Sequence, residues 1–307
     1  MNPLFAYLRR PQSIAAMALV LCAYLVHFRG RVRLRFARQL TDHSTLIAPF
    51  NGLVYLFSRT PNRPFLDADA FPELAPLKAH WEAIRDEGLR LMQNGQVRAA
   101  TGHNDVGFHT FFKRGWKRFY LKWYGDPPAS AVALCPITTA LLAAIPSVHG
   151  AMFATLPPGG RLGRHRDPFA GSLRYHLGLR TANDDACWIE VDGQRRSWRD
   201  GQVMMFDETY VHEALNETGV DRLILFCDVE RPVWGPVGAL NRFAIRHVMR
   251  ATATQNMEGE KVGAINRLYA RLYWLKDAGQ GLKARNRRLY YGLKYVVIAA
   301  VLVLLLV

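Results

Sequence analysis

Cysteine is scarce in this chain, with four residues among 307. Cys22, Cys135, Cys187 and Cys227 stand far apart, and no two of them form a CxxC pair. This absence excludes a structural zinc site of the usual spacing and argues against a disulfide framework. We therefore expect reduced thiols and a reducing compartment.

Acidic residues are also in short supply, with 25 Asp and Glu against 40 Lys and Arg and a formal net charge of +15. An excess of this size indicates an anionic partner, which is a nucleic acid, a phosphate-bearing substrate or an acidic membrane face. Because basic residues cluster beside apolar chain ends, anionic lipid headgroups are favoured and a nucleic acid is not.

Charged residues are missing altogether from the run at 11–28, PQSIAAMALVLCAYLVHF. Eighteen helical residues rise about 27 Å, close to the roughly 30 Å of a bilayer core. A signal peptide ends in a small-residue cleavage site, whereas this run ends in HFRGRVRLRF, so we predict an uncleaved anchor. The heavier basic flank follows the run and predicts that the next domain faces the cytoplasm.

A second apolar run, YYGLKYVVIAAVLVLLLV at 290–307, follows a basic stretch and predicts a C-terminal anchor of the same topology. The alternative is an interfacial or buried apolar tail. A third run at 131–148 contains Pro136 and Pro146, so a buried helix starting near Pro136 suits it better than a membrane span.

Between the two ends, 151–231 reads as short strands separated by turns such as LPPGG and NDD, which is typical of a barrel or sandwich. Helical periodicity marks 77–92 and 241–276. We therefore divide the chain into an N-terminal anchor with its basic flank (1–38), a membrane-proximal and helical support region (39–150), a β core (151–235), a C-terminal helical region (236–289) and a C-terminal anchor (290–307).

Three residues have the character of a metal site. In an extended segment, residues two apart point to the same side, so His165 and Asp167 can bind one metal together. A bare HxD is weak evidence, but His212 follows the later apolar run VMMF and supplies a third ligand. Two histidines and one carboxylate form the facial triad of iron(II) oxygenases, with positions open for a 2-oxo acid and dioxygen. Zinc has affinity for the same ligands, although its catalytic sites need a water and a base.

The residues around the triad favour iron with an acidic cosubstrate. SLRYHLGL alternates polar and apolar residues, so Arg174 and His176 share one strand face. Arg222 opens the apolar strand RLILFCDV, where a buried guanidinium is costly unless it is paired. The distal carboxylate of 2-oxoglutarate is a natural bidentate partner. The alternative is an ion pair with one of three carboxylates: Asp221, Asp207 or Asp228.

The motifs HRDPFAGSLRYHLGL, EVDGQRRSWRDG and MMFDETYVHEA resemble those of the aspartyl/asparaginyl β-hydroxylase family, and within it those of bacterial lipid A 2-hydroxylases. The resemblance extends through RQLTDHSTLIAPFNGLVYLFS and GWKRFYLKWYG and covers most of the chain. It implies a double-stranded β-helix, a jelly-roll-like and mainly β catalytic core with flanking helices. It also implies Fe(2+), 2-oxoglutarate as cosubstrate and dioxygen.

The same resemblance implies residue roles. Arg222 matches the Arg that holds the distal carboxylate, and Arg174 and His176 match residues near the 1-carboxylate. The peptidyl branch commonly has Gly where this chain has Asp167, so the complete triad favours the lipid branch. That branch also uses a hydroxyl before the first His to hold 2-oxoglutarate. Ungapped matching puts Ala154 there, with Thr155 adjacent, so Thr155 is the candidate.

The implied substrate is a secondary acyl chain of lipid A, hydroxylated at carbon 2, at the bacterial inner membrane with the catalytic domain in the cytoplasm. Alternatives are another membrane lipid, a peptidyl Asp or Asn, and a non-catalytic lipid-binding barrel. FFKRGWKRFYLKWYG at 111–125 interleaves cations with aromatic residues, which suits either an interface with lipid phosphates or a strand whose rings fill the core.

Overall fold

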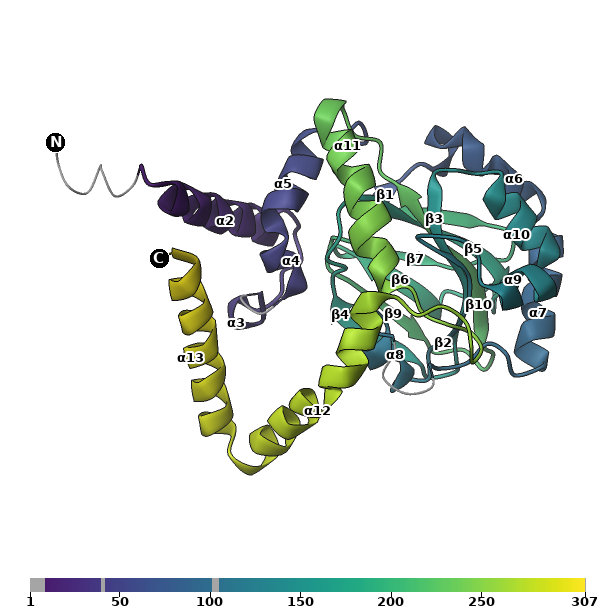
Figure 1. Ribbon diagram of the computed structural model, residues 1–307. Helices are drawn as coiled ribbons and strands as arrows, with labels where there is room; N and C mark the ends of the chain where they lie inside the picture. The colour runs from purple at the N-terminus through teal and green to yellow at the C-terminus, as the bar shows by residue number, and fades with distance from the viewer. Residues whose placement is uncertain (1–8, 40–41, 101–104, 307) are drawn as a thin grey trace.

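The computed structural model describes residues 9–39, 42–100 and 105–306. The first eight residues of the predicted N-terminal anchor region lie outside the described residues, as does Val307 at the end of the second. Figure 1 shows a central β structure with helices on both sides and two long helices projecting from one side.

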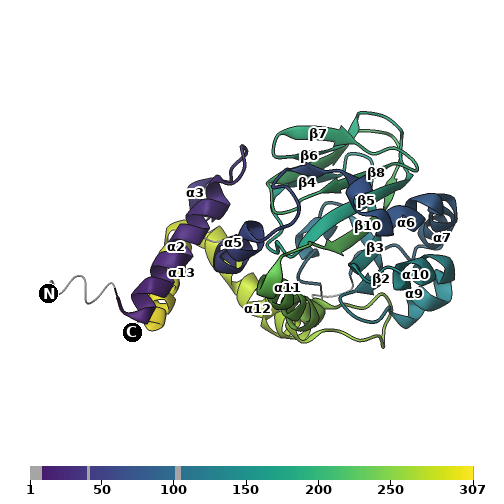
Figure 2. The same ribbon diagram turned by 90° about the horizontal axis from the view of Figure 1, so that it is seen from above.

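Two antiparallel sheets form the centre of the molecule, as Figures 1 and 2 show. The larger sheet has the strand order β1-β8-β5-β10-β3-β2, and the smaller has the order β4-β9-β6-β7. From β3 to β10 the chain alternates between the sheets except at the β6–β7 hairpin, which is the connectivity of a jelly roll. The strands are β1 (Phe65–Leu66), β2 (Lys117–Trp123), β3 (Val148–Leu156), β4 (Arg161–His165), β5 (Ser172–Arg180), β6 (Cys187–Val191), β7 (Gln194–Ser197), β8 (Val203–Phe206), β9 (His212–Asn216) and β10 (Arg222–Glu230).

The predicted mainly β core is confirmed, but its sheet extends beyond the range 151–235. Strands β1 and β2 both join the larger sheet, although they come from the region expected to be helical support. The pattern of 111–125 predicted a strand as one of two alternatives, and β2 realises it. Strand β1 has only two residues, too few to show a periodicity from which it could be assigned.

Successive side chains of β5 point alternately into two different cores, one on each face of the larger sheet. Leu173, Tyr175 and Leu177 belong to the core between the larger sheet and the helices. Arg174 and His176 face the space between the two sheets, as the alternation predicted. Helix packing on the outer face is close, because a Cβ at Gly88 would lie 3.1 Å from side-chain atoms of β3 and β10.

Helices cover the outer face of the larger sheet. The predicted helix at 77–92 is present but broken at His80, and α10 begins at Pro136 as predicted. The predicted helical stretch at 241–276 is interrupted, because 253–263 is not helical. The helices on this face are α6 (Ala75–Ala79), α7 (Trp81–Gln93), α9 (Ala129–Leu134) and α10 (Pro136–Ala143). The short helix α8 (His109–Phe112) packs instead against the core between the two sheets. After the barrel come α11 (Gly235–Ala244), the single turns η3 (Ile245–Met249) and η4 (Arg250–Thr252), and α12 (Ala264–Arg285).

The chain ends form the projecting helices. Helix α2 (Pro11–Phe28) has the predicted bounds and is followed by α3 (Phe36–Gln39), α4 (His43–Leu46) and α5 (Ala48–Leu56). Within the described ranges, α2 is the one helix long and apolar enough to cross a bilayer. Helix α13 (Arg287–Leu306) covers the second predicted anchor. Because its last side chains lie outside the described residues, spanning by α13 stays a prediction.

Candidate active site

The structure brings His165, Asp167 and His212 together between the two sheets. His165 ends β4 and His212 begins β9, and the two residues are direct cross-strand partners with ring centroids 4.1 Å apart. One ligand atom from each of the three side chains lies within 4.8 Å of the others. The HxD segment is held in place because Asp167 N donates to Glu208 O at 2.9 Å. The predicted convergence of these three residues is therefore present.

Both histidines are oriented through the ring nitrogen that faces away from the other ligands. His165 Nδ1 lies 2.7 Å from Gly163 O, and His212 Nδ1 lies 2.9 Å from Tyr210 O. A carbonyl accepts only, so each Nδ1 carries the proton and each Nε2 keeps its lone pair. This is the arrangement that metal-binding histidines use.

Burial sets the protonation of the site. It lowers the pKa of His165 and lowers that of His212 to about 3, and the proximity of the two rings adds to the effect at His212. Burial alone would raise the pKa of Asp167, but Arg174 and the two histidines outweigh it, so that pKa lies below its usual value. At neutral pH the three side chains are two neutral imidazoles and a carboxylate, which is the donor set for a divalent metal.

Arg174 lies beside the triad rather than apart from it. Its Nη2 is 2.7 Å from Asp167 Oδ2, and its Nε is 2.9 Å from Asp228 Oδ1. The other oxygen of Asp167, Oδ1, lies 3.9 Å from His165 Nε2. Arg174 thus holds one carboxylate oxygen while the second faces the histidines. The sequence placed Arg174 at this site but gave no signal for Asp228 as its partner.

Arg222 is buried without a carboxylate partner among the described residues. Its side chain is 2 % exposed, its Nε makes no hydrogen bond, and the guanidinium lies 4.4 Å over the Trp198 ring. Burial lowers its pKa to about 10. The alternative of an ion pair with Asp221, Asp207 or Asp228 is not realised. An unpaired buried guanidinium is costly and therefore suits an anionic ligand.

His176 lines the same cavity as Arg222. Trp198 Nε1 donates to His176 Nδ1 at 3.4 Å, so the proton of the ring is on Nε2, which has no partner in the described part of the chain. Burial, with Arg174 and Arg222 nearby, holds the pKa of His176 well below its usual value. Trp198 thus supports both side chains, and sequence reasoning missed it because a lone tryptophan has no distinguishing pattern.

The cavity around these groups has a volume of about 40 Å³ and a largely apolar lining. Phe111 contacts the first predicted ligand, with ring centroids 4.9 Å apart from His165. Besides the triad, Arg174, His176 and Arg222, the lining consists of Phe108, Phe111, Trp116, Leu162, Ile189, Trp198, Phe206, Ala214, Ile224 and Phe226. The free space suits a metal ion and a water, so a larger ligand requires lining side chains to move.

Thr155 does not join the site. Met152 and Ala154 face the cavity side of β3, whereas the cross-strand partner of Thr155 is Leu223, a residue of the helix-covered core. Successive strand residues point to opposite faces, so Thr155 points away from the metal ligands. The structure therefore does not support a contact between Thr155 and a cosubstrate in this cavity.

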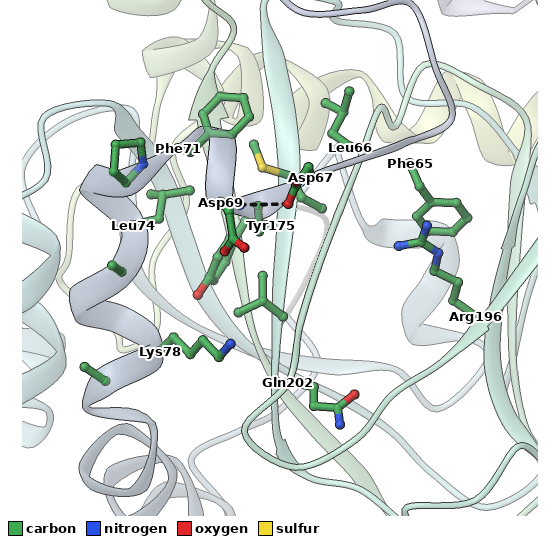
Figure 3. Close-up of a pocket in the computed structure, with 16 residues that line it drawn as sticks. Phe65, Leu66, Asp67, Asp69, Phe71, Leu74, Lys78, Tyr175, Arg196 and Gln202 are labelled. Atoms are coloured by element: carbon green, nitrogen blue, oxygen red, sulfur yellow. Dashed lines mark hydrogen bonds between the residues drawn. The ribbon is translucent and has the colours of Figure 1, made fainter.

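A larger cavity of about 1040 Å³ lies elsewhere, between β1, α6 and the edge of β8 (Figure 3). Its lining includes Lys78, Arg196 and Tyr175, and it contains none of the predicted site residues. Tyr175 belongs to the outer face of β5, so this cavity is separate from the triad.

The aromatic segment 111–125 supports the site from within the core. Trp116, Phe119, Tyr120 and Trp123 are all buried. The alternative of rings exposed at a lipid interface is therefore wrong for β2, because its side chains alternate between the two cores. Charge and aromatic spacing alone do not say which faces of a strand are covered.

Comparison with known proteins agrees with this geometry. The family model of aspartyl/asparaginyl β-hydroxylases matches residues 78–232. The ornithine lipid ester-linked acyl 2-hydroxylase of Rhizobium tropici is 33% identical over 200 residues, which are 64% of this chain and 71% of that protein. The aspartyl/asparaginyl β-hydroxylase of Mus musculus is 30% identical over 165 residues, 52% of this chain but only 22% of that protein.

Among solved structures, a Pseudomonas putida prolyl-4-hydroxylase is similar at 22% identity and a TM-score of 0.33, covering 50% of this chain and 88% of that one. The family match and the histidine–carboxylate site define an enzyme of the 2-oxoglutarate-dependent dioxygenase class. The chain belongs to the aspartyl/asparaginyl β-hydroxylase family, as its motifs predicted.

Proposed function

We propose that this protein is an iron(II)- and 2-oxoglutarate-dependent hydroxylase that acts on the acyl chain of a membrane lipid, at carbon 2 of a secondary acyl chain of lipid A. The observation that carries this proposal is one cavity between the two sheets that contains both a His-Asp-His donor set and a guanidinium without a carboxylate partner among the described residues.

His165, Asp167 and His212 would hold the iron, and Arg222 would bind the distal carboxylate of 2-oxoglutarate. The donor set fits, because neutral imidazoles and one carboxylate are ligands that ferrous iron prefers. With 2-oxoglutarate and dioxygen, the iron supplies an oxidant that hydroxylates an unactivated C–H bond, with succinate and carbon dioxide as co-products.

The chain's own residues provide orientation and exclude water. The backbone carbonyls of Gly163 and Tyr210 fix the histidine rings. Arg174 fixes the carboxylate of Asp167. The apolar lining keeps bulk water from the reacting carbon, and no general base is needed for such a step.

An apolar lining also supports the choice of substrate. Once the lining side chains move apart, an acyl chain would lie against Phe108, Phe111 and Leu162, whereas a peptidyl Asp would bring a polar backbone against them. The R. tropici relative is named for hydroxylation of a lipid acyl chain. Helix α2 supports a position at the bacterial inner membrane, with the barrel in the cytoplasm. The remaining alternatives are another membrane lipid, such as an aminoacyl lipid, and a non-catalytic lipid-binding barrel.

Mass spectrometry of extracted lipids tests the proposal. Bacteria producing the chain should show lipid A with one added oxygen on a secondary acyl chain, and bacteria producing His212→Ala should not. His80→Ala, at an exposed histidine away from the cavity, is the matched control and should retain the product. The added oxygen on a different lipid would reassign the substrate, and no added oxygen with the unaltered chain would reject the proposed function.

A further inference from the structure

Helix α11 carries apolar side chains on two opposite faces. Val237 of α11 is buried on the side of the barrel, as is Ile245 in the turn η3 that continues the helix. Leu240 and Phe243, three residues apart on the other face, are 43% and 58% exposed, and Trp234 just before the helix is 59% exposed. A helix that is apolar on both faces is normally covered on both. Among the described residues, His247 contacts the Phe243 ring with a centroid distance of 4.6 Å, but the outer face of α11 stays largely exposed.

The end of α5 continues this outer face. Trp234 N donates to Phe57 O at 2.9 Å, which brings the start of α11 against the end of α5. Leu56 is 76% exposed beside this junction. The α5–α11 surface consists of Leu53, Leu56, Phe57, Trp234, Leu240 and Phe243. An exposed apolar patch rimmed by polar groups marks an interaction site with a protein or a membrane.

The two segments that form this surface carry basic but no acidic side chains. No Asp or Glu occurs in 43–66 or in 232–257, the two segments that form it. Arg59 lies 4.4 Å over the Trp234 ring, and Arg242 of α11 and Arg246 of η3 are exposed. Arg242 lies 3.7 Å from Glu230, a carboxylate at the end of β10 outside both segments. Apolar and aromatic side chains bordered by arginines are the composition of helices that bind acidic membrane surfaces.

The α5–α11 surface adjoins the helix that is able to cross a membrane. A Cβ at Gly52 of α5 would lie 3.3 Å from the Cys22 sulfur of α2. In both ribbon views α5 and α11 lie on the side of the barrel from which α2 projects, and α7 lies on the opposite side (Figures 1 and 2). A bilayer entered by α2 is therefore the nearest apolar phase available to these side chains.

We propose that the α5–α11 surface lies in the headgroup region of the same anionic bilayer that α2 enters. The barrel is then held at the membrane by a second, in-plane contact in addition to α2. This role does not depend on which lipid is hydroxylated. Tryptophan and arginine side chains favour the headgroup region, where one end of each is apolar and the other hydrated.

The test uses the full-length chain in nanodiscs of phosphatidylglycerol, with one copy per disc. In a Cys22→Ala background, Phe243→Cys carries an environment-sensitive fluorophore, and Glu82→Cys on α7 is the matched control. Doxyl-labelled lipids should quench the label at position 243 roughly twofold more than the label at position 82, because the first sits among headgroups. Adding Arg246→Glu should reduce the quenching at position 243 while the unfolding midpoint stays within the range of the parent variant.

Equal quenching at positions 243 and 82 in a folded protein would overturn the proposal. So would protection of position 243 that occurs only with two copies per disc, since this would identify a second copy of the chain as the occupant. Quenching at position 243 in a protein without any lipid hydroxylase activity would leave the membrane contact standing and reject the proposed function alone.

Discussion

Arg174 bridges Asp167 and Asp228, with Nη2 2.7 Å from one carboxylate and Nε 2.9 Å from the other. Arg174 and Asp228 are also cross-strand partners on β5 and β10. Asp228 in turn accepts a hydrogen bond from Tyr124 Oη at 2.9 Å. The orientation of the predicted metal carboxylate is therefore fixed by the larger sheet through one guanidinium.

Arg174→Lys keeps the positive charge but loses the two-armed geometry. We expect a folded protein whose iron(II) affinity falls roughly 10- to 100-fold, which is the usual cost of losing a group that orients a metal ligand. Anaerobic iron(II) titration measures this, with Arg180→Lys at the exposed end of the same strand as control. Unchanged affinity in Arg174→Lys would show that Asp167 does not need this support.

Arg222→Met should weaken the binding of 2-oxoglutarate without lowering the stability of the folded protein. Removing an anion-binding guanidinium raises the KM for 2-oxoglutarate roughly 10- to 100-fold. The free energy of unfolding without cosubstrate should stay equal or increase, because a buried unpaired charge is removed. Steady-state kinetics and urea unfolding measure the two quantities. A large loss of stability would mean that Arg222 is a structural residue with a partner in the folded chain.

Because His176 is buried and neutral, the stability of the metal-free protein should depend on pH. Its pKa is far below the usual 6.5 in the folded state because of burial, so below about pH 6.5 the unfolded chain binds a proton that the folded chain does not. The free energy of unfolding therefore falls with decreasing pH, by up to about 1.4 kcal/mol per pH unit from this group. Urea unfolding at pH 7 and pH 5 should show a shallower decline for His176→Gln. If the free energy of unfolding fell equally between pH 7 and pH 5 in the parent protein and in His176→Gln, the imidazole of His176 would not be held neutral by burial.

Arg29 links the end of α2 to the barrel, and we expect this link to stabilise the folded protein. Its guanidinium lies 3.9 Å over the Tyr55 ring and 4.0 Å over the Tyr210 ring and pairs with Asp207. Arg29→Met should lower the free energy of unfolding by about 2 kcal/mol or more, because the buried Asp207 loses one of its two cationic partners and keeps only Arg231. Arg31→Met, at an exposed residue of the same basic flank, should have little effect. Chemical unfolding in detergent compares the two, and equal values would remove Arg29 from this role.

The sequence was most informative where spacing carries chemistry. The triad and Arg222 were identified because an HxD pair, a distant His and a cation opening an apolar strand form one pattern. Asp228 was considered only as a partner of Arg222, and no role was assigned to Trp198 or Arg29, because their contacts join segments that no local pattern connects. Their importance follows from cross-strand register and from side-chain packing, which sequence spacing does not encode.

Two errors have the same physical origin. Thr155 was a candidate for binding a cosubstrate, yet one residue along a strand reverses the face, and Ala154 holds the cavity side. The rings of β2 were compatible with exposure, yet both faces of that strand are covered. Alternation along a strand predicts that its two faces have different side chains, but it does not say which neighbouring element covers each face. The exposed apolar and basic surface of this protein lies on α5 and α11, not on β2.

Anaerobic absorption spectroscopy tests the central claim most directly. Iron(II) and 2-oxoglutarate added to the purified full-length chain should produce a weak visible charge-transfer band, and His165→Ala and His212→Ala should not produce it. Arg222→Met should produce the band only at higher 2-oxoglutarate concentrations. A folded chain that gives no band, or a band that persists without either histidine, would contradict an iron site made by these three side chains.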